Sequence, residues 1–307
     1  MWAIAILVGL VALGAGGVRY ALGQNPHRVL DTVDAVTGSA KDVALLHRAA
    51  TGTHAGQKLL VYGTGKAGAP LPVFVFFHGG SWAHGDPEHY GFIARNMAPE
   101  GFIVVLGGYR LGEAGRYPAM LEDTAAAIGW TYRNVAQFGG DPQRIHLGGH
   151  SAGAYNVVQV ALEQRWLAAE GVPQGAIDGV VGLAGPYDFF PFDSDSTKAA
   201  FGAAGAGEGS QPVNHARGDA PPMLLVHGEA DTLVRPRNTR ALAAALAREG
   251  ARVEVEYLPE GDHNAPLLGL ANPWRRDPRV HDRVTNFLTR GEAQRDKVSV
   301  PVQDGTS

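Results

Sequence analysis

The sequence contains no cysteine, which excludes disulfide bonds, thiolate catalysis and cysteine-ligated zinc. Charge is also scarce. Only 18% of the 307 residues are charged and 45% are hydrophobic, so the chain can bury a large core and is not a disordered chain. A basic excess is missing as well, because 26 Lys and Arg stand against 30 Asp and Glu, a formal net charge of −4. Proteins that bind nucleic acids are usually basic, so the composition argues against such a partner.

The amino-terminal residues 1–18 have no charged side chain, and Arg19 is the first. As a helix this run would be about 27 Å long, close to the ~30 Å hydrocarbon core of a bilayer. Three interpretations remain open: an uncleaved anchor, a cleaved signal peptide, or a buried helix of the globular domain. We assign residues 1–23 as an N-terminal anchor or signal segment. We expect a membrane-anchored or exported (periplasmic or extracellular) protein, with a possible tether through residues 1–20.

Short apolar runs alternate with helical patterns from about residue 57 onward, which predicts an α/β fold with a mostly parallel central sheet and helices on both faces. The predicted strands are 58–62, 73–77, 102–106, 145–148, 180–184, 223–226 and 253–257. The predicted helices are 118–138, 152–170 and 237–249, each followed by a glycine that fits a left-handed cap. These elements place one α/β domain at residues 40–290.

Two segments interrupt this alternation. Residues 185–220 are too long for an ordinary connection between strands, and we assign them as a lid-like insertion. Residues 291–307 are polar, and we expect a disordered tail there.

A nucleophile motif follows the predicted strand 145–148. Residues 149–153 read Gly-His-Ser-Ala-Gly, which fits G-x-S-x-G, and a predicted helix comes next. In this context the serine occupies a sharp strand-to-helix turn, and the small flanking residues prevent clashes around it. The sequence therefore predicts Ser151 as a catalytic nucleophile.

A second motif follows the predicted strand 73–77 and reads His-Gly-Gly-Ser-Trp at residues 78–82. Acyl transfer develops negative charge on a carbonyl oxygen, and preorganised backbone N–H groups stabilise that charge. We expect an oxyanion hole formed by the N–H groups of Gly80, Ser81 and Ala152.

His78 belongs to the same motif, and we expect it to hydrogen-bond backbone groups and fix the loop. A metal site with the neighbouring His84, Asp86 and His89 is the weaker interpretation, because the H-E-x-x-H spacing is missing.

An acid and a base follow in the chain order Ser, Asp, His that α/β hydrolases use. Asp231 comes after the predicted strand 223–226, and His263 comes after the strand 253–257. Both positions lie at the carboxyl ends of strands, where open α/β sheets place their sites. We therefore expect His263 to act as the base and Asp231 to orient it. Glu229 and Asp188 are weaker candidates for the acid, and Asp262 is adjacent to His263 and poorly placed for the role.

With these motifs together, the chain resembles the α/β-hydrolase serine esterases, and more narrowly the HGG-x-W carboxylesterases near the BD-FAE and hormone-sensitive-lipase-like groups. The resemblance covers about residues 40–290 and is carried by 78–82, 109–111, 117–118, 140–142, 149–153, 227–231 and 262–263. It implies hydrolysis of small to medium acyl esters through an acyl-enzyme, with a small-molecule ester as substrate and no cofactor or metal. Ser81 stands where lipase-like members usually have a third glycine.

The substrate pocket is less well defined by the sequence. Trp82 and Tyr187 directly follow motif positions, and we expect them to line an acyl or alcohol pocket. The kynurenine formamidases share the pattern, so amide or formamide hydrolysis is the alternative activity. The fold also serves as a ligand receptor without turnover, but the intact Ser-His-Asp set argues for an enzyme. His263 must be neutral to act as a base, and an imidazole takes up a proton at about pH 6.5. We therefore expect activity to fall below about pH 6.

Overall fold

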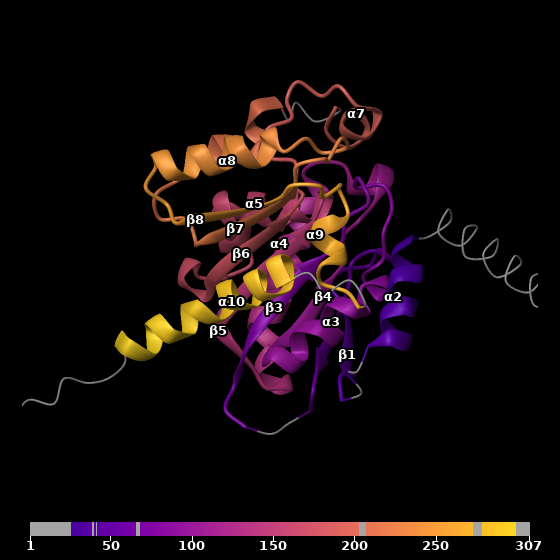
Figure 1. Cartoon of the computed structure of the whole chain (residues 1–307), viewed down its shortest axis with the longest axis vertical. Helices are drawn as coiled ribbons and strands as arrows, with labels where there is room; N and C mark the ends of the chain where they lie inside the picture. The colour runs from indigo at the N-terminus through magenta and orange to yellow at the C-terminus, as the bar shows by residue number, and fades with distance from the viewer. Residues whose placement is uncertain are drawn as a thin grey trace, which may run out of the picture.

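The computed structural model describes residues 26–38, 40, 42–65, 68–202, 207–272 and 278–298. An eight-stranded sheet in the order β1-β2-β4-β3-β5-β6-β7-β8 runs through the middle of these residues (Figure 1). The strand pairs from β4 to β8 are parallel, and β1 and β2 join them antiparallel. The strands are β1 (Ala44–Ala50), β2 (Lys58–Gly63), β3 (Leu71–Phe77), β4 (Ile103–Gly107), β5 (Gly140–His150), β6 (Ile177–Leu183), β7 (Met223–Gly228) and β8 (Val253–Leu258). The predicted fold class is confirmed.

Helices cover both faces of the sheet. Side chains of α2, α3, α9 and α10 pack on one face, and side chains of α4, α5, α6 and α8 pack on the other. The helices are α2 (Pro26–Thr37), α3 (Gly91–Met97), α4 (Ala119–Asn134), α5 (Ala152–Leu162), α6 (Arg165–Ala169), α7 (Asp195–Phe201), α8 (Arg237–Arg248), α9 (Ala265–Leu268) and α10 (Pro278–Val298). Two layers of helices around a parallel sheet require strands that are apolar on both sides.

The central strand β3 shows how the sequence meets this requirement. Val73, Val75 and Phe77 join the core on the α4–α5 side, and Phe74 and Phe76 join the core on the α3–α10 side. All five side chains are at most 1% exposed. The uninterrupted apolar run 73–77 is therefore a strand buried on both faces, as the sequence predicts.

The predicted left-handed caps are confirmed, because Gly139, Gly171 and Gly250 have φ values of 83°, 71° and 80°. The predicted helix 152–170, in contrast, is two helices. The chain leaves helical geometry at Glu163, with φ −96° and ψ 88°. The Glu163 carboxylate accepts hydrogen bonds from Trp166 Nε1 at 2.7 Å and Arg165 Nε at 2.5 Å, and these contacts hold the break between α5 and α6.

The structure differs from the sequence predictions at two further places. The edge strand β1 was not predicted, because most of its side chains are exposed and it therefore shows no alternation of apolar and polar residues. At the other end, α10 continues to Val298, although a disordered tail was expected from residue 291. The segment contains Glu, Ala, Gln, Arg and Lys, which are good helix formers, so its polar composition was a misleading signal.

The expected anchor or signal segment, residues 1–23, lies outside the described residues, and so does the stretch 299–307. Within the described ranges, no helix combines the length and the apolar character needed to cross a bilayer.

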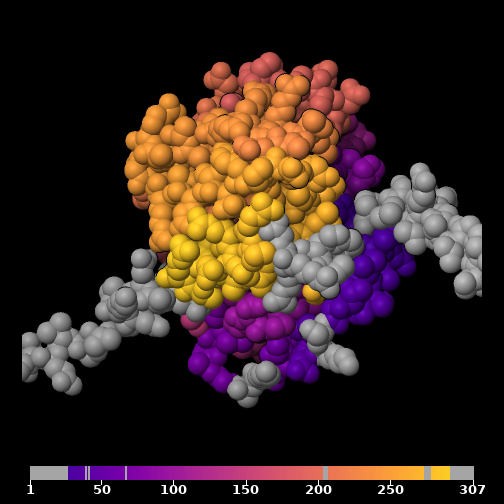
Figure 2. Space-filling view, viewed as in Figure 1, coloured from indigo at the N-terminus to yellow at the C-terminus, as the bar shows by residue number. Residues whose placement is uncertain are grey.

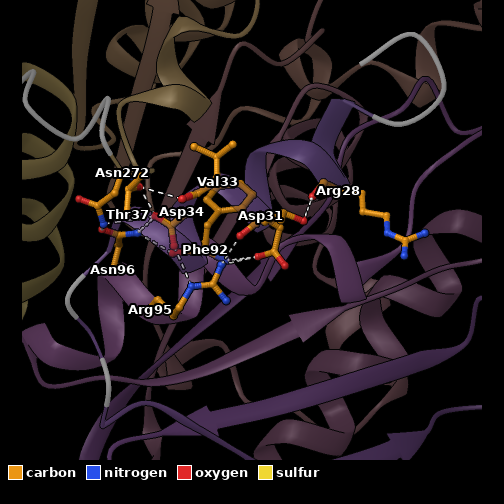
Figure 3. Close-up of polar contacts among 10 residues, drawn as sticks. Arg28, Asp31, Val33, Asp34, Thr37, Phe92, Arg95, Asn96 and Asn272 are labelled. Atoms are coloured by element: carbon orange, nitrogen blue, oxygen red, sulfur yellow. Dashed lines mark hydrogen bonds and ion pairs between the residues drawn. The ribbon is translucent and has the colours of Figure 1, made fainter. Parts of the chain in front are cut away.

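A buried polar network attaches α2 to the rest of the domain (Figure 3). The Asp34 carboxylate is fully buried and accepts hydrogen bonds from Arg95 Nε at 2.7 Å, Asn96 Nδ2 at 2.9 Å and the backbone N–H of Asn272 at 2.7 Å. Asp31 accepts from Arg95 Nη2 at 2.6 Å and from the backbone N–H of Phe92 at 2.8 Å. One helix is thereby linked to α3 and to the loop after α9.

Replacing Asp34 by alanine should lower the free energy of unfolding by about 2 kcal/mol, because the partly buried Arg95 keeps only its contacts with Asp31 and the donors of Asn96 and Asn272 lose this acceptor. Urea denaturation would measure this loss as a lower midpoint. The control is Glu113→Ala, which removes an exposed carboxylate 3.6 Å from Arg116 and should leave the midpoint unchanged. Equal midpoints for the Asp34 variant and the parent would contradict the assignment of this network as a stabilising contact.

Candidate active site

Four loops meet at one edge of the sheet because the strands that precede them are parallel. The loops follow the carboxyl ends of β3, β5, β7 and β8, and they carry the motif 78–82, Ser151, Asp231 and His263. Segments that are far apart in the sequence therefore converge, as the strand-end positions predict.

Ser151 lies at a sharp turn between β5 and α5. Its φ of 54° and ψ of −119° lie in a region that side-chain-bearing residues rarely adopt. A Cβ at Gly149 would lie 2.4 Å from the backbone of Gly153, and a Cβ at Gly153 would lie 2.2 Å from the carbonyl oxygen of Phe77. The two glycines of the motif are therefore required by the close approach of three backbone segments.

Three side chains form a hydrogen-bonded line. The distance from His263 Nε2 to Ser151 Oγ is 2.9 Å, and the distance from His263 Nδ1 to Asp231 Oδ2 is 2.7 Å. An ionised carboxylate can only accept, so Nδ1 carries the proton and donates it to Asp231. Nε2 is then free to accept the hydrogen bond of the serine hydroxyl.

The Asp231 carboxylate is almost completely buried. Its Oδ1 accepts from the backbone N–H groups of Leu233 and Val234, both at 2.9 Å, and Oδ2 lies 3.3 Å from Nε2 of His227. Burial alone would raise the pKa of this carboxyl, but the hydrogen bonds from His227 and His263 hold it well below its ordinary value. Asp231 is therefore ionised, and its charge can stabilise a protonated His263.

The alternative acids lie elsewhere. Glu229 forms an exposed ion pair with Arg240 at 3.1 Å. The Asp262 carboxylate accepts from the backbone N–H groups of Asn264 and Ala265 at 2.9 and 3.0 Å. The backbone N–H of Asp188 donates to Asn238 Oδ1 at 2.8 Å, and the carboxylate that His263 Nδ1 contacts is that of Asp231.

The loop after β3 has an unusual backbone. Gly80 has a φ of 117°, and the next two residues, Ser81 and Trp82, have φ values of 54° and 57°. A Cβ at Gly80 would lie 2.0 Å from the carbonyl oxygen of His84. Among the described residues, no acceptor bonds to the backbone N–H of Gly80, Ser81 or Ala152. These three donors are therefore available to a ligand.

His78 fixes this loop, as expected from the sequence. Its Nδ1 lies 2.8 Å from the carbonyl oxygen of Gly79, and its ring stacks on Tyr109 with a centroid distance of 4.6 Å. Tyr109 in turn donates from its hydroxyl to the backbone carbonyl of His78 at 2.9 Å. Within the described residues no cluster of three His, Asp or Glu side chains could hold a metal ion, and the Asp86 carboxylate lies 2.9 Å from the ammonium of Lys58.

A cavity of about 290 Å³ opens beside Ser151. Its walls come from the loop after β3, from the start of α5, from the segment 186–197 and from the loop that leads from Asp231 to α8. The predicted insertion therefore forms part of the cavity wall. Its role as a lid stays a prediction.

The two predicted pocket residues have different positions. Trp82 lines the cavity, and its indole N–H donates to Asn156 Oδ1 at 3.1 Å, which sets the orientation of the ring. Tyr187 is fully buried and does not line the cavity; its neighbour Pro186 does. Phe189, which no motif marks, lines the cavity and stacks on Trp82.

Sequence reasoning also missed two buried histidines that support the hydrogen-bonded line. His150 Nε2 lies 3.0 Å from the carbonyl oxygen of His263 and so holds the loop of that residue. His227 contacts Thr239 Oγ1 through Nδ1 and the carbonyl of Val234 through Nε2, both at 2.7 Å. Their adjacency to Ser151 and to the segment 228–231 was the only available signal.

Fold and site together define an α/β hydrolase. The BD-FAE family model matches residues 59–246, which is more than half of the chain. The chain belongs to the BD-FAE family. The resemblance derived from the motifs is therefore confirmed.

Similar curated proteins are esterases, and similar solved structures share the fold. Esterase LipC from Mycobacterium tuberculosis is 30% identical over 69% of this chain, and isoprenylcysteine alpha-carbonyl methylesterase ICME from Arabidopsis thaliana is 28% identical over 66%. The matches cover 57% and 52% of those proteins, so the chain spans little more than half their length. Esterase B from Lactobacillus rhamnosis has a TM-score of 0.76 at 19% identity, over 92% of this chain and 96% of that one. An esterase from Pseudomonas putida has a TM-score of 0.69 at 23% identity, over 88% and 89%.

The pKa values of three histidines determine how the stability of the fold should depend on pH. Burial lowers the pKa of His78 to about 4 and that of His150 to about 3, and burial together with His89 and His263 lowers the pKa of His27 to about 4. Between about pH 4 and 6.5 the unfolded chain therefore binds more protons than the folded chain. Stability should fall as the pH falls through this window, by up to about 1.4 kcal/mol per pH unit for each histidine.

Urea denaturation between about pH 4.5 and 7 would measure this slope. His27→Phe keeps a ring against Tyr90, on which His27 stacks at 5.1 Å, and should make the slope shallower. The control His54→Gln changes an exposed loop side chain and should leave the slope as it is. A flat profile for the parent protein would contradict the neutral state of these rings in the folded chain.

Proposed function

We propose that the protein hydrolyses carboxylic esters of small to medium acyl groups through an acyl-enzyme on Ser151. The observation that carries this proposal is the hydrogen-bonded line from Ser151 Oγ through His263 to the Asp231 carboxylate, at distances of 2.9 and 2.7 Å. Serine hydrolases of several folds use this arrangement of hydroxyl, imidazole and carboxylate. The names of the curated relatives, which are esterases, also support it.

In the proposed reaction the Ser151 oxygen attacks the ester carbonyl carbon as its proton passes to His263 Nε2. Asp231 holds the imidazole in the required tautomer and stabilises its charged form. The tetrahedral intermediate collapses, its bond to the alcohol oxygen breaks, and His263 donates the proton to the leaving alcohol. Water then attacks the acyl-serine by the same route and releases the acid.

The negative charge of the intermediate needs donors, and the N–H groups of Gly80, Ser81 and Ala152 are proposed for this role. They are fixed by the left-handed backbone at residues 80–82 and by the first turn of α5. Preorganised donors cost no reorganisation when charge develops, and one such donor contributes roughly 3 kcal/mol in other enzymes. Trp82 and Phe189 then supply the apolar part of the cavity beside the acyl-serine.

Replacing Ser151 by alanine should lower kcat/KM for 4-nitrophenyl butyrate by at least about 10⁴-fold, because it removes the nucleophile. Asp231→Asn should cost about as much, since an amide favours the wrong imidazole tautomer. Circular dichroism checks that both variants fold.

The matched control is Glu229→Gln, which removes the alternative acid on the same loop and should change kcat/KM by less than about twofold. A panel of 4-nitrophenyl esters of increasing chain length together with N-formylkynurenine would test the substrate class. Turnover of the formamide without turnover of any ester would contradict ester hydrolysis as the function.

A further inference from the structure

Three charged side chains line the cavity beside Ser151: Asp193, Arg235 and Arg237. All three are exposed at the wall of the cavity, and together they carry a formal charge of +1. The remaining lining residues are polar or apolar and carry no charge. The cavity lining therefore carries a net positive formal charge, in a chain whose net charge is −4.

The two arginines differ from most arginines of the described surface. Arg240, one turn further along α8, pairs with Glu229 at 3.1 Å, and Arg217 pairs with Asp219 at 2.6 Å. Within the described residues, neither Arg235 nor Arg237 has an ion pair or a side-chain hydrogen bond, and Asp193 does not neutralise them. Both side chains are exposed, and guanidinium groups match carboxylates with two parallel N–H bonds.

The loop that carries these arginines is fixed by the active site itself. Asp231 Oδ1 accepts from the N–H groups of Leu233 and Val234, and the carbonyl of Arg235 accepts from Asn238 Nδ2 at 3.1 Å. Asn238 Oδ1 in turn accepts from the backbone N–H groups of Tyr187 and Asp188 at 2.9 and 2.8 Å. The arginine backbones are therefore held between the proposed acid and the insertion.

The segments that carry these charged residues lie together at one end of the molecule. α8 and α7 lie at the same end of the domain, above the sheet (Figure 1). The surface at that end is formed by the segment around α8 and by the insertion (Figure 2). Both segments line the cavity beside Ser151, and together they supply all three charged lining residues.

We infer that Arg235 and Arg237 form an anion-binding subsite, and that the protein prefers esters that carry a carboxylate away from the scissile bond. The inference rests on the proposed ester hydrolysis and specifies its substrate class. The carboxylate is held by the guanidinium groups while the ester carbonyl lies at Ser151. The Asp193 carboxylate repels the carboxylate of a substrate. The preference therefore holds for substrates whose carboxylate lies nearer to the arginines than to Asp193.

Two matched ester pairs test the subsite. 4-Acetoxybenzoate against 4-acetoxybenzamide places the charge on the leaving alcohol, and the mono-4-nitrophenyl ester of adipic acid against 4-nitrophenyl hexanoate places it on the acyl group. The readout is the ratio of kcat/KM for the charged ester to that for the neutral ester. The parent should favour the charged ester in at least one pair, and this ratio should decline in about 1 M NaCl, where the Debye length is about 3 Å.

The variant Arg235→Gln/Arg237→Gln should lower that ratio about three- to tenfold and leave kcat/KM for the neutral ester nearly unchanged. Asp193→Asn should raise the ratio. The matched control is Arg248→Gln, which removes an exposed charge from the other end of α8, about 16 Å away, and should not alter it.

A ratio that stays the same in the double variant for both pairs would overturn the anion subsite. In that case turnover of the neutral esters would leave the proposed function in place. If the parent hydrolyses none of the four esters, the proposed function itself fails.

Discussion

The contact between the buried Asp231 carboxylate and His263 is the interaction on which the site depends. A charge removed from water requires compensation, and two backbone N–H groups and two histidines supply it. The same bonds fix the imidazole tautomer and the path of the loop that follows Asp231. One carboxylate thus determines where the base points, toward Ser151 Oγ at 2.9 Å, and how one wall of the cavity is built.

Close backbone contacts impose a second constraint. The elbow at Ser151 and the loop after β3 approach so closely that a side chain at Gly149, Gly153 or Gly80 would overlap a neighbouring backbone. Positive φ values at Ser151 and Ser81 store strain that regular elements would avoid. The surrounding core sustains this strain, because β3 and β5 are buried on both faces and cannot relax independently.

Much of this arrangement could be predicted from local sequence. Strands such as β3 are continuous apolar runs, and the positions of Ser151, Asp231 and His263 after such runs place them at one edge of a parallel sheet. The break at Glu163 and the edge strand β1 could not be predicted in this way. The break depends on side-chain contacts of Glu163 with Trp166, and β1 depends on pairing with β2 rather than on burial. Both are decided by tertiary contacts that override propensity.

The residues of the cavity wall also differ in whether local sequence could predict them. Trp82 follows a motif and lines the cavity, whereas Tyr187 is fully buried and its backbone N–H is bonded to Asn238 on α8. Arg235 and Arg237 carry no motif, and only the folded loop shows that they face the cavity of Ser151. Residues needed for bond cleavage must have a defined chemistry at a defined strand end, so local sequence can reveal them. Residues that select a substrate need only reach the cavity, and for that reason the three-dimensional structure is required to find them.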